Sequence, residues 1–335
     1  MKGFCVLLIG SLIALPLAAI AAGNESEYEN WEYLFNGKSL EGWVQRGGKA
    51  VYKVEEGSIV GDTTPNTPNS FLCTERTFGD FILEIDFKVD PSLNSGVQIR
   101  SESIPEYKNG QVHGYQVEID PSSRAWTGGV YDEGRRGWLQ NLEGKEAARK
   151  AFKQGEWNHF RIEAMGFNIR TWVNGIPAAD LVDSMTPRGF VALQVHSTGS
   201  EKPLQVRWRN IRIIDLEKDG NDPFKGDWEG TLGTDAVPIT AHVIALGGDD
   251  YRADLLRKSD APSAPLDVMD GKFLDGKVTF SGQDFWGEIK GGYFRGAKKG
   301  DVSETVEMRR VVRRSPTVGD ASSEGTAGMI DLAGK

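Results

Sequence analysis

The segment GYQVEID, residues 114–120, places polar side chains at every second position. Apolar residues alternate there with Gln116, Glu118 and Asp120. Because successive side chains of a β-strand point to opposite faces, this alternation predicts a strand with one amide and two carboxylates on the same face. Carboxylates in such a position are suited to proton transfer, as a general acid or a general base.

Two further segments repeat the pattern with other chemical groups. One places Gln98 and Arg100 on a single face, and another does the same with Gln194 and His196. The three faces together offer amides, carboxylates, a guanidinium and an imidazole, and they lack the lysine and threonine typical of a solvated strand face. The alternative is that these residues are simply the outer face of a sandwich, and the alternation by itself favours neither interpretation.

A loop rich in glycine and aromatic residues follows the acidic segment. Residues 124–138, RAWTGGVYDEGRRGW, contain Trp126, Tyr131 and Trp138. Aromatic rings beside an amide-lined face suit a sugar, whose apolar ring face stacks on them while its hydroxyls bind amides and carboxylates. The alternative, strongest for Trp138, is that the rings pack the loop onto the fold. His113, just before the acidic segment, either contacts a substrate or is an ordinary loop histidine.

The elements that must position these residues are predominantly β-strands. An alternation of period two recurs over residues 80–89, 158–163, 168–173, 190–196 and 205–214. The dipeptide Asn174-Gly175 is typical of a two-residue hairpin, and residues 141–153 are the one segment expected to form a short helix. Many strands with almost no helix predict an all-β fold, here an antiparallel sandwich of about 190 residues.

A second unit is expected after the charged segment EKDGNDP, residues 217–223, which has no apolar period and is typical of a linker. Strand-like runs then continue and predict a small antiparallel barrel or half-barrel of about 90 residues. We therefore expect domains at residues 31–216 and 222–314. The last residues, 315–335, are rich in glycine and serine and are expected to be disordered.

Composition excludes several classes of protein. The 335 residues carry 39 Lys and Arg against 48 Asp and Glu, a formal net charge of −9, so we expect no nucleic-acid partner. The GxSxG, HExxH, P-loop and GxGxxG motifs are absent, which argues against a nucleotide cofactor. Of the two cysteines, Cys5 and Cys73, the first lies in the expected signal segment, so an intramolecular disulfide is not expected.

The first residues predict export. Residues 1–21 hold a lysine, an interrupted apolar run and a group of small residues before an A-x-A site, as in a secretory signal peptide. The apolar run is too short and interrupted for a good membrane span, so none is expected in the mature chain. We expect a periplasmic or extracellular protein, and the sequence does not indicate its oligomeric state.

Ordered motifs across the first unit resemble the 3-keto-disaccharide hydrolase family. They are LFNGKSLEGW, FGDFILEIDFKVDPSLNSGVQIRS, HGYQVEID, TGGVYDE, GEWNHFRIEAMG, WVNG, GFVALQVHS and VRWRNIRI. The similarity covers about residues 31–216. It implies a concanavalin-like jelly-roll sandwich in a secreted or periplasmic protein.

The resemblance also implies an activity on small saccharides already oxidised at C3. Members of the family are 3-keto-glucoside 1,2-lyases and 3-keto-2-hydroxyglucal hydratases, whose two steps sum to hydrolysis, and a divalent metal is implied for some. A ketone at C3 acidifies the C2 hydrogen, so a base can remove it, an enolate forms and the C1 substituent leaves. This route differs from the oxocarbenium chemistry of ordinary glycosidases.

On this hypothesis the site needs a base, an enolate stabiliser and groups that orient hydroxyls. Glu118 or His196 would be the base, and Arg100, or a metal held by Glu118, Asp120 and His196, would stabilise the enolate. The expected catalytic residues are therefore Glu118, His196, Asp120 and Arg100. The expected substrate-binding residues are Asn94, Gln98, His113, Gln116, Trp126, Tyr131 and Gln194, with Trp126 or Tyr131 closing over the ring.

Two other functions remain open from the sequence. In a conventional glycosidase Glu118 and Asp120 would be acid and base, and residues two apart on a strand lie about 7 Å apart, within the inverting range. A non-catalytic carbohydrate-binding protein is the second alternative, because a jelly roll does not fix function. The linkage, anomer and aglycone of a substrate are not indicated.

Overall fold

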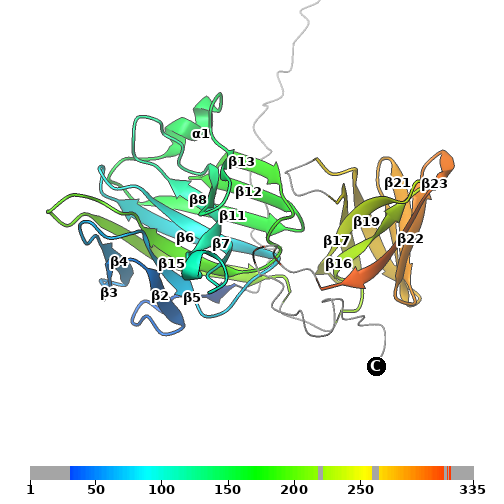
Figure 1. Cartoon of the computed structure of the whole chain (residues 1–335), viewed down its shortest axis with the longest axis horizontal. Helices are drawn as coiled ribbons and strands as arrows, with labels where there is room; N and C mark the ends of the chain where they lie inside the picture. The colour runs from blue at the N-terminus through cyan, green and yellow to red at the C-terminus, as the bar shows by residue number, and fades with distance from the viewer. Residues whose placement is uncertain (1–30, 218–221, 259–263, 313–314, 316, 318–335) are drawn as a thin grey trace, which may run out of the picture. The chain divides into compact units, whose positions relative to one another are not determined.

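The fold was analysed in a computed structural model (Figure 1), which describes residues 31–217, 222–258, 264–312, 315 and 317. The expected signal segment, residues 1–21, and most of the expected tail lie outside the described residues. From Glu32 onward the chain forms one compact unit. No helix in the described ranges is long and apolar enough to span a membrane.

Two antiparallel sheets form the sandwich, as the alternating segments predicted. The first sheet has the order β13-β12-β11-β6-β15-β4-β3, with β1 paired to β15. Its strands are β1 (Glu32–Tyr33), β3 (Val51–Glu55), β4 (Ser58–Asp62), β6 (Phe81–Val89), β11 (Asn158–Met165), β12 (Asn168–Val173), β13 (Ile176–Val182) and β15 (Gln205–Asp215).

The second sheet has the order β10-β9-β8-β7-β14-β5-β2. Its strands are β2 (Trp43–Gly47), β5 (Ser70–Thr74), β7 (Ser95–Glu102), β8 (His113–Ile119), β9 (Val130–Glu133), β10 (Gly137–Gln140) and β14 (Phe190–Val195). The helix expected within residues 141–153 is present as the short α1 (Glu146–Ala151). A 3-10 helix spans Lys108–Gly110. The all-β prediction is confirmed.

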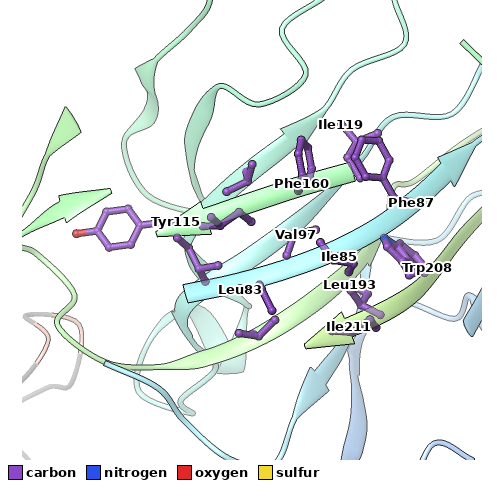
Figure 2. Close-up of a cluster of buried hydrophobic side chains, with 14 of the residues drawn as sticks. Leu83, Ile85, Phe87, Val97, Tyr115, Ile119, Phe160, Leu193, Trp208 and Ile211 are labelled. Atoms are coloured by element: carbon purple, nitrogen blue, oxygen red, sulfur yellow. The ribbon is translucent and has the colours of Figure 1, made fainter. Parts of the chain in front are cut away.

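The core lies between the inward faces of the two sheets. Leu83, Ile85 and Phe87 of β6 are fully buried, and Figure 2 shows them among side chains from β7, β8 and β14. The rings of Phe87 and Phe160 lie 4.3 Å apart between centroids. Each such side chain stabilises the fold by about 1.5 to 3 kcal/mol through burial. This core holds the second sheet rigidly, and with it the side chains of its outer face.

The predicted hairpin at Asn174-Gly175 is present. It joins β12 to β13, and the two residues have φ values of 49° and 81°. A two-residue turn of type I′ requires a positive φ at both positions, which asparagine and glycine adopt most readily. Val173 and Ile176 are consequently paired across the turn.

Residues after the expected linker form a closed antiparallel barrel. Its strands are β16 (Gly226–Leu232), β17 (Val237–Gly247), β18 (Asp250–Arg257), β19 (Asp267–Leu274), β20 (Lys277–Ser281), β21 (Phe285–Lys290), β22 (Tyr293–Lys298) and β23 (Asp301–Val311). Apolar side chains, among them Trp228, Phe280 and Phe294, pack its interior. A tight turn joins β19 to β20, where Asp275 and Gly276 adopt positive φ.

Candidate active site

The two outer faces of the sandwich carry different chemistry. On the first sheet, Glu84 accepts hydrogen bonds from Arg161 at 3.0 Å and from Arg212 at 2.9 Å. Arg161 also pairs with Glu163 at 2.8 Å, so this face carries a network of partly buried ion pairs in which each carboxylate has an arginine partner. On the second sheet the outer face instead carries buried amides beside a buried carboxylate. The candidate site lies there.

A chain of hydrogen bonds crosses β7 and β8 on this face. The hydroxyl of Ser101 donates to Gln98 at 2.7 Å, the amide of Gln98 donates to Gln116 at 2.6 Å, and the amide of Gln116 donates to Oε2 of Glu118 at 2.8 Å. Gln98 and Gln116 are direct partners in the strand register. Each amide is oriented by the next, and every bond points toward the carboxylate. The shared face predicted for Gln116 and Glu118 is confirmed, and Gln98 of β7 extends it.

The carboxylate of Glu118 is buried and accepts hydrogen bonds on both oxygens. Its Oε1 accepts from the amide of Asn94 at 2.7 Å, and the residue is 5% exposed. Burial raises the pKa of Glu118 above its ordinary value, while the bonds from Asn94 and Gln116 act in the opposite direction. A carboxylate with a raised pKa is a stronger base than an ordinary one and can still be ionised near neutral pH.

Gly96 makes this arrangement possible. It lies on β7 directly opposite Glu118, and a Cβ at this position would lie 2.6 Å from Cδ of Gln116. Any larger residue would therefore push the Gln116 side chain away from β7. The glycine serves the polar face by leaving room for the amide chain.

Gln194 lies on the other side of Gly96, in the same cross-strand row. Both atoms of its amide are buried, and within the described ranges neither has a hydrogen-bond partner. One strand, β7, lies between Gln194 and Glu118, and two inter-strand spacings place their backbones about 10 Å apart. The Gln194 side chain is fully buried, and a buried amide without partners costs about 1 to 3 kcal/mol.

Asp120 follows the end of β8 and organises the loop behind it. Its carboxylate accepts from Nε of Arg124 at 2.8 Å and from the backbone N–H groups of Ser122 at 3.1 Å and Trp126 at 3.3 Å. Burial alone would raise the pKa of Asp120, but these hydrogen bonds lower it below its ordinary value. The carboxylate thus positions the loop and is poorly suited to donate a proton.

Arg124 is a residue that the sequence patterns did not single out. Its Nη2 lies 3.8 Å from Oε1 of Glu118, and its guanidinium carbon lies 5.0 Å from the ring centre of Trp126 and 5.4 Å from that of Trp138. The signal available in the sequence was its position four residues after Asp120 and two residues before Trp126. The structure thus adds a cation next to the buried carboxylate.

The aromatic residues pack partly on one another. Trp138 makes edge contacts with Trp126 at 4.9 Å and with Tyr131 at 5.3 Å between ring centroids. Trp126 also packs against the main core. Tyr131 is half-buried on β9 and is the register partner of Gln116, so it remains on the polar face. The structure therefore places Tyr131 as the aromatic residue nearest the amide chain in register, with the two tryptophans as its support.

Arg100 does not share the face of Gln98, so the prediction of a common face is wrong. Its φ is 44°, and the register between β7 and β8 shifts between Ile99 and Glu102. This bulge turns the side chain away, because regular alternation stops there. The guanidinium is 1% exposed and donates to the carbonyls of Gly79 at 2.7 Å and Gly166 at 2.8 Å and to Asp80 at 3.0 Å.

The two candidate histidines differ. His113 is fully buried; its Nδ1 lies 2.8 Å from the Gln111 carbonyl, its Nε2 lies 2.8 Å from the Thr317 hydroxyl, and its ring lies 4.0 Å from that of Tyr107. It is a packed residue of the fold and not an exposed loop histidine. His196 follows β14, is half-buried and donates from Nδ1 to the carbonyl of Ser197 at 2.9 Å.

Glu133 is a second carboxylate that the sequence patterns missed. It is half-buried on β9, opposite Gly114. Burial raises the pKa of Glu133; His196 and Asn69 lower it, and the negative charge of Glu118 raises it again. The charge of Glu133 therefore interacts with those of Glu118 and His196, the two residues considered for the base. The signal in the sequence was weak, because β9 is only four residues long.

The expected metal ligands do not form a three-ligand group in the structure. Both oxygens of Glu118 accept amide bonds, and Asp120 is paired with Arg124. In the part of the chain that the structure describes, a single group of three ligand-type side chains has its atoms within 4.8 Å of one another, and it does not include Glu118, Asp120 or His196. The residues of the polar face therefore do not fit a preformed metal site.

That group consists of Asp80, Glu217 and His242. His242 contacts Asp227 at 2.6 Å through Nδ1 and Asp80 at 2.7 Å through Nε2. Burial would lower the pKa of His242, but the two carboxylates raise it to about 10. Both ring nitrogens of His242 are hydrogen-bonded to carboxylates, so this group is an ion-pair cluster.

The chain is thus an antiparallel β-sandwich protein whose second sheet presents a buried carboxylate, amides and aromatic rings on its outer face. Residues 30–214 match the family described as the 3-keto-alpha-glucoside-1,2-lyase-like domain, and the chain belongs to this family. The match confirms the resemblance found in the sequence motifs. None of the curated proteins matches the chain.

Several solved structures have a similar sandwich. One is a candidate glycosyl hydrolase from Parabacteroides distasonis ATCC 8503, with 20% identity, a TM-score of 0.41, and coverage of 58% of this chain and 99% of that one. Another is the carbohydrate binding module CBM66 from Bacillus subtilis, with 15% identity, a TM-score of 0.38, and coverage of 54% and 98%. These likenesses are too distant to carry an argument about function.

Proposed function

We propose that the protein acts on 3-keto-glucosides and 3-keto-disaccharides by removing the C2 proton and eliminating the C1 substituent. The observation that carries this proposal is the buried carboxylate of Glu118, held by amides on both oxygens and raised in pKa. The hydrogen at C2 beside a ketone is only moderately acidic, so its removal needs a positioned base with such a pKa. Family membership supports the same chemistry.

In the first step the Glu118 carboxylate takes the proton from C2. The electron pair of the C2–H bond moves toward the C3 carbonyl, whose oxygen becomes the enolate. The pair then returns to form the C1=C2 double bond as the bond between C1 and the glycosidic oxygen breaks. The leaving oxygen takes a proton, and an alcohol and a 3-keto-2-hydroxyglucal result. Addition of water across C1=C2 would complete a net hydrolysis.

Glu133 is the residue that we assign to protonation of the leaving oxygen. Burial and the negative charge of Glu118 both raise the pKa of Glu133, which favours its protonated form. This division of roles follows from their positions: Glu118 is bound by two amide donors, whereas Glu133 has one long contact of 3.5 Å from Asn69.

We assign recognition of the sugar to two residues of the second sheet, Gln194 and Tyr131. Gln194 offers an unpartnered amide, and Tyr131 offers a half-buried ring on the same face. Gln98 and Gln116 already use their amides to orient Glu118, so we assign them a positioning role. A conventional glycosidase built on Glu118 and Asp120 is disfavoured, because Asp120 is paired with Arg124 and its pKa is lowered.

The test is incubation of the purified protein with a 3-keto-glucoside and with its parent glucoside, with and without a chelator. We expect the 2-hydroxyglucal product from the 3-keto substrate alone. In D2O the recovered 3-keto substrate should carry deuterium at C2 if proton removal is reversible. Turnover of the parent glucoside at an equal or higher rate would contradict the proposal. Loss of activity on addition of the chelator would show that the reaction needs a metal ion.

A further inference from the structure

We propose that Arg124 is the residue that stabilises the enolate, the role that the family resemblance led us to expect of Arg100 or of a metal. This inference rests on the proposed function and deepens it. It is carried by the position of the guanidinium next to Glu118, 3.8 Å from Nη2 to Oε1. It also explains why a carboxylate and two indole rings surround an arginine at the edge of the polar face.

The guanidinium of Arg124 is held from two directions. Its Nε donates to Asp120 at 2.8 Å, and its carbon lies 5.0 and 5.4 Å from the ring centres of Trp126 and Trp138. An ion pair with a fixed donor geometry and contact with aromatic faces restrict a long side chain that is otherwise 44% exposed. The cation is thus preorganised, although it stands at the surface.

The remaining donors of Arg124 are aimed at the reaction site. At 3.8 Å the Nη2 group is too far from Glu118 for a hydrogen bond, so the pair is an electrostatic contact. A guanidinium has five N–H donors, and the bond to Asp120 uses the one on Nε. Donors on the Nη groups therefore remain for an oxygen atom of a ligand placed against Glu118.

The chemistry requires a cation in this position. The base takes a proton from C2, and the negative charge moves to the oxygen on C3, the adjacent carbon. A group that stabilises this charge must therefore lie within a few ångströms of the base, which is where Arg124 lies. Removing one preorganised donor from a developing oxyanion typically lowers kcat by about 10² to 10³.

A surface ion pair without any catalytic role would also bring Arg124 near two carboxylates, and the experiment must separate the two cases. The chain offers a matched control in Arg209 on the outer face of the first sheet. Its guanidinium carbon lies 4.0 Å from the ring centre of Trp157, its Nε lies 3.5 Å from Asp86, and its side chain is 41% exposed.

The experiment compares Arg124→Ala with Arg209→Ala in the full-length protein. It measures the deuterium exchange at C2 of a 3-keto-glucoside in D2O, and kcat and KM for the elimination. We expect exchange and kcat of Arg124→Ala to fall by about 10² to 10³, with partial recovery on addition of guanidinium ion. Arg209→Ala should stay within about twofold of the wild type. Thermal unfolding of both variants checks that the fold is intact.

Three results would overturn the inference: unchanged exchange and kcat in Arg124→Ala, a rise in KM alone, or a loss that Arg209→Ala shares. The variant Asp120→Asn adds a test of positioning, because it removes the charge that holds Nε while leaving Arg124 present. We expect it to lower kcat less than Arg124→Ala does. Absence of exchange and turnover in the wild type would instead contradict the proposed function, so the two failures are distinguishable.

Discussion

Asn94 donates a hydrogen bond of 2.7 Å to Oε1 of Glu118 from the turn that precedes β7. This bond and the one from Gln116 favour the charged carboxylate against the effect of burial. The base therefore depends on two amides that come from different segments of the chain.

Replacement of Asn94 by alanine should raise the pKa of Glu118 further. A hydrogen bond to a charged group contributes about 1.5 to 3 kcal/mol, which corresponds to a rise of about one pKa unit or more. The acidic limb of the kcat/KM profile should move to higher pH by about that amount, while the rate at the alkaline plateau changes less. An acidic limb at the wild-type position would contradict the assignment of Glu118 as the base.

Replacement of Glu118 by glutamine should lower kcat by about 10² to 10⁴, the usual contribution of a positioned base. The side chain keeps its size, so far-ultraviolet circular dichroism should show the wild-type fold. Glu84→Gln is a matched control, since this glutamate also lies on an outer strand face but is paired with Arg161 and Arg212. Turnover by Glu118→Gln equal to that of the control would refute the role.

The raised pKa of Glu118 predicts how activity depends on pH. The base must be ionised, so the rate should fall as the pH falls through a pKa above the ordinary glutamate value of about 4.3. Since folding raises this pKa, protonation of Glu118 favours the folded state, and activity should be lost at a pH where the fold persists. Parallel pH titrations of kcat/KM and of tryptophan fluorescence check this, and coincident transitions would contradict it.

Regular strands made part of this site predictable. The period of two placed Gln116 and Glu118 on one face because β8 is regular over both residues. The same rule failed for Arg100, where a bulge with positive φ interrupts β7. The apolar pattern of the sequence does not indicate this bulge. Alternation describes local direction and cannot anticipate a shift of register.

Contacts between distant segments were beyond the reach of the sequence. Arg124 approaches Glu118 through the conformation of a loop, and His113 forms a hydrogen bond with Thr317, 204 residues away. Glu133 was overlooked for a different reason, since β9 is only four residues long and offers too few positions for a period to be recognised. The fold class was therefore predictable, whereas the cation and the second carboxylate required the structure.

Replacement of Arg100 by methionine should destabilise the protein without a direct effect on catalysis. The guanidinium is buried and donates to Asp80 at 3.0 Å, and its removal takes one compensating cation from a buried carboxylate. Breaking such a pair costs about 3 to 5 kcal/mol. We expect a free energy of unfolding lower by about that amount in denaturant titrations, with kcat per folded molecule unchanged. A lower kcat in a variant of wild-type stability would show that Arg100 takes part in catalysis and would contradict this prediction.

Replacement of Glu133 by glutamine should affect substrates according to their leaving group. If Glu133 protonates the glycosidic oxygen, a 3-keto-glucoside with an alkyl aglycone should react about 10² to 10⁴ times more slowly, because an alkoxide leaves poorly without a proton. A 4-nitrophenyl aglycone leaves as a stable anion, so its elimination should change little. Deuterium exchange at C2, which Glu118 performs, should persist with both substrates. An equal loss on both aglycones, or loss of the exchange, would assign Glu133 to another step.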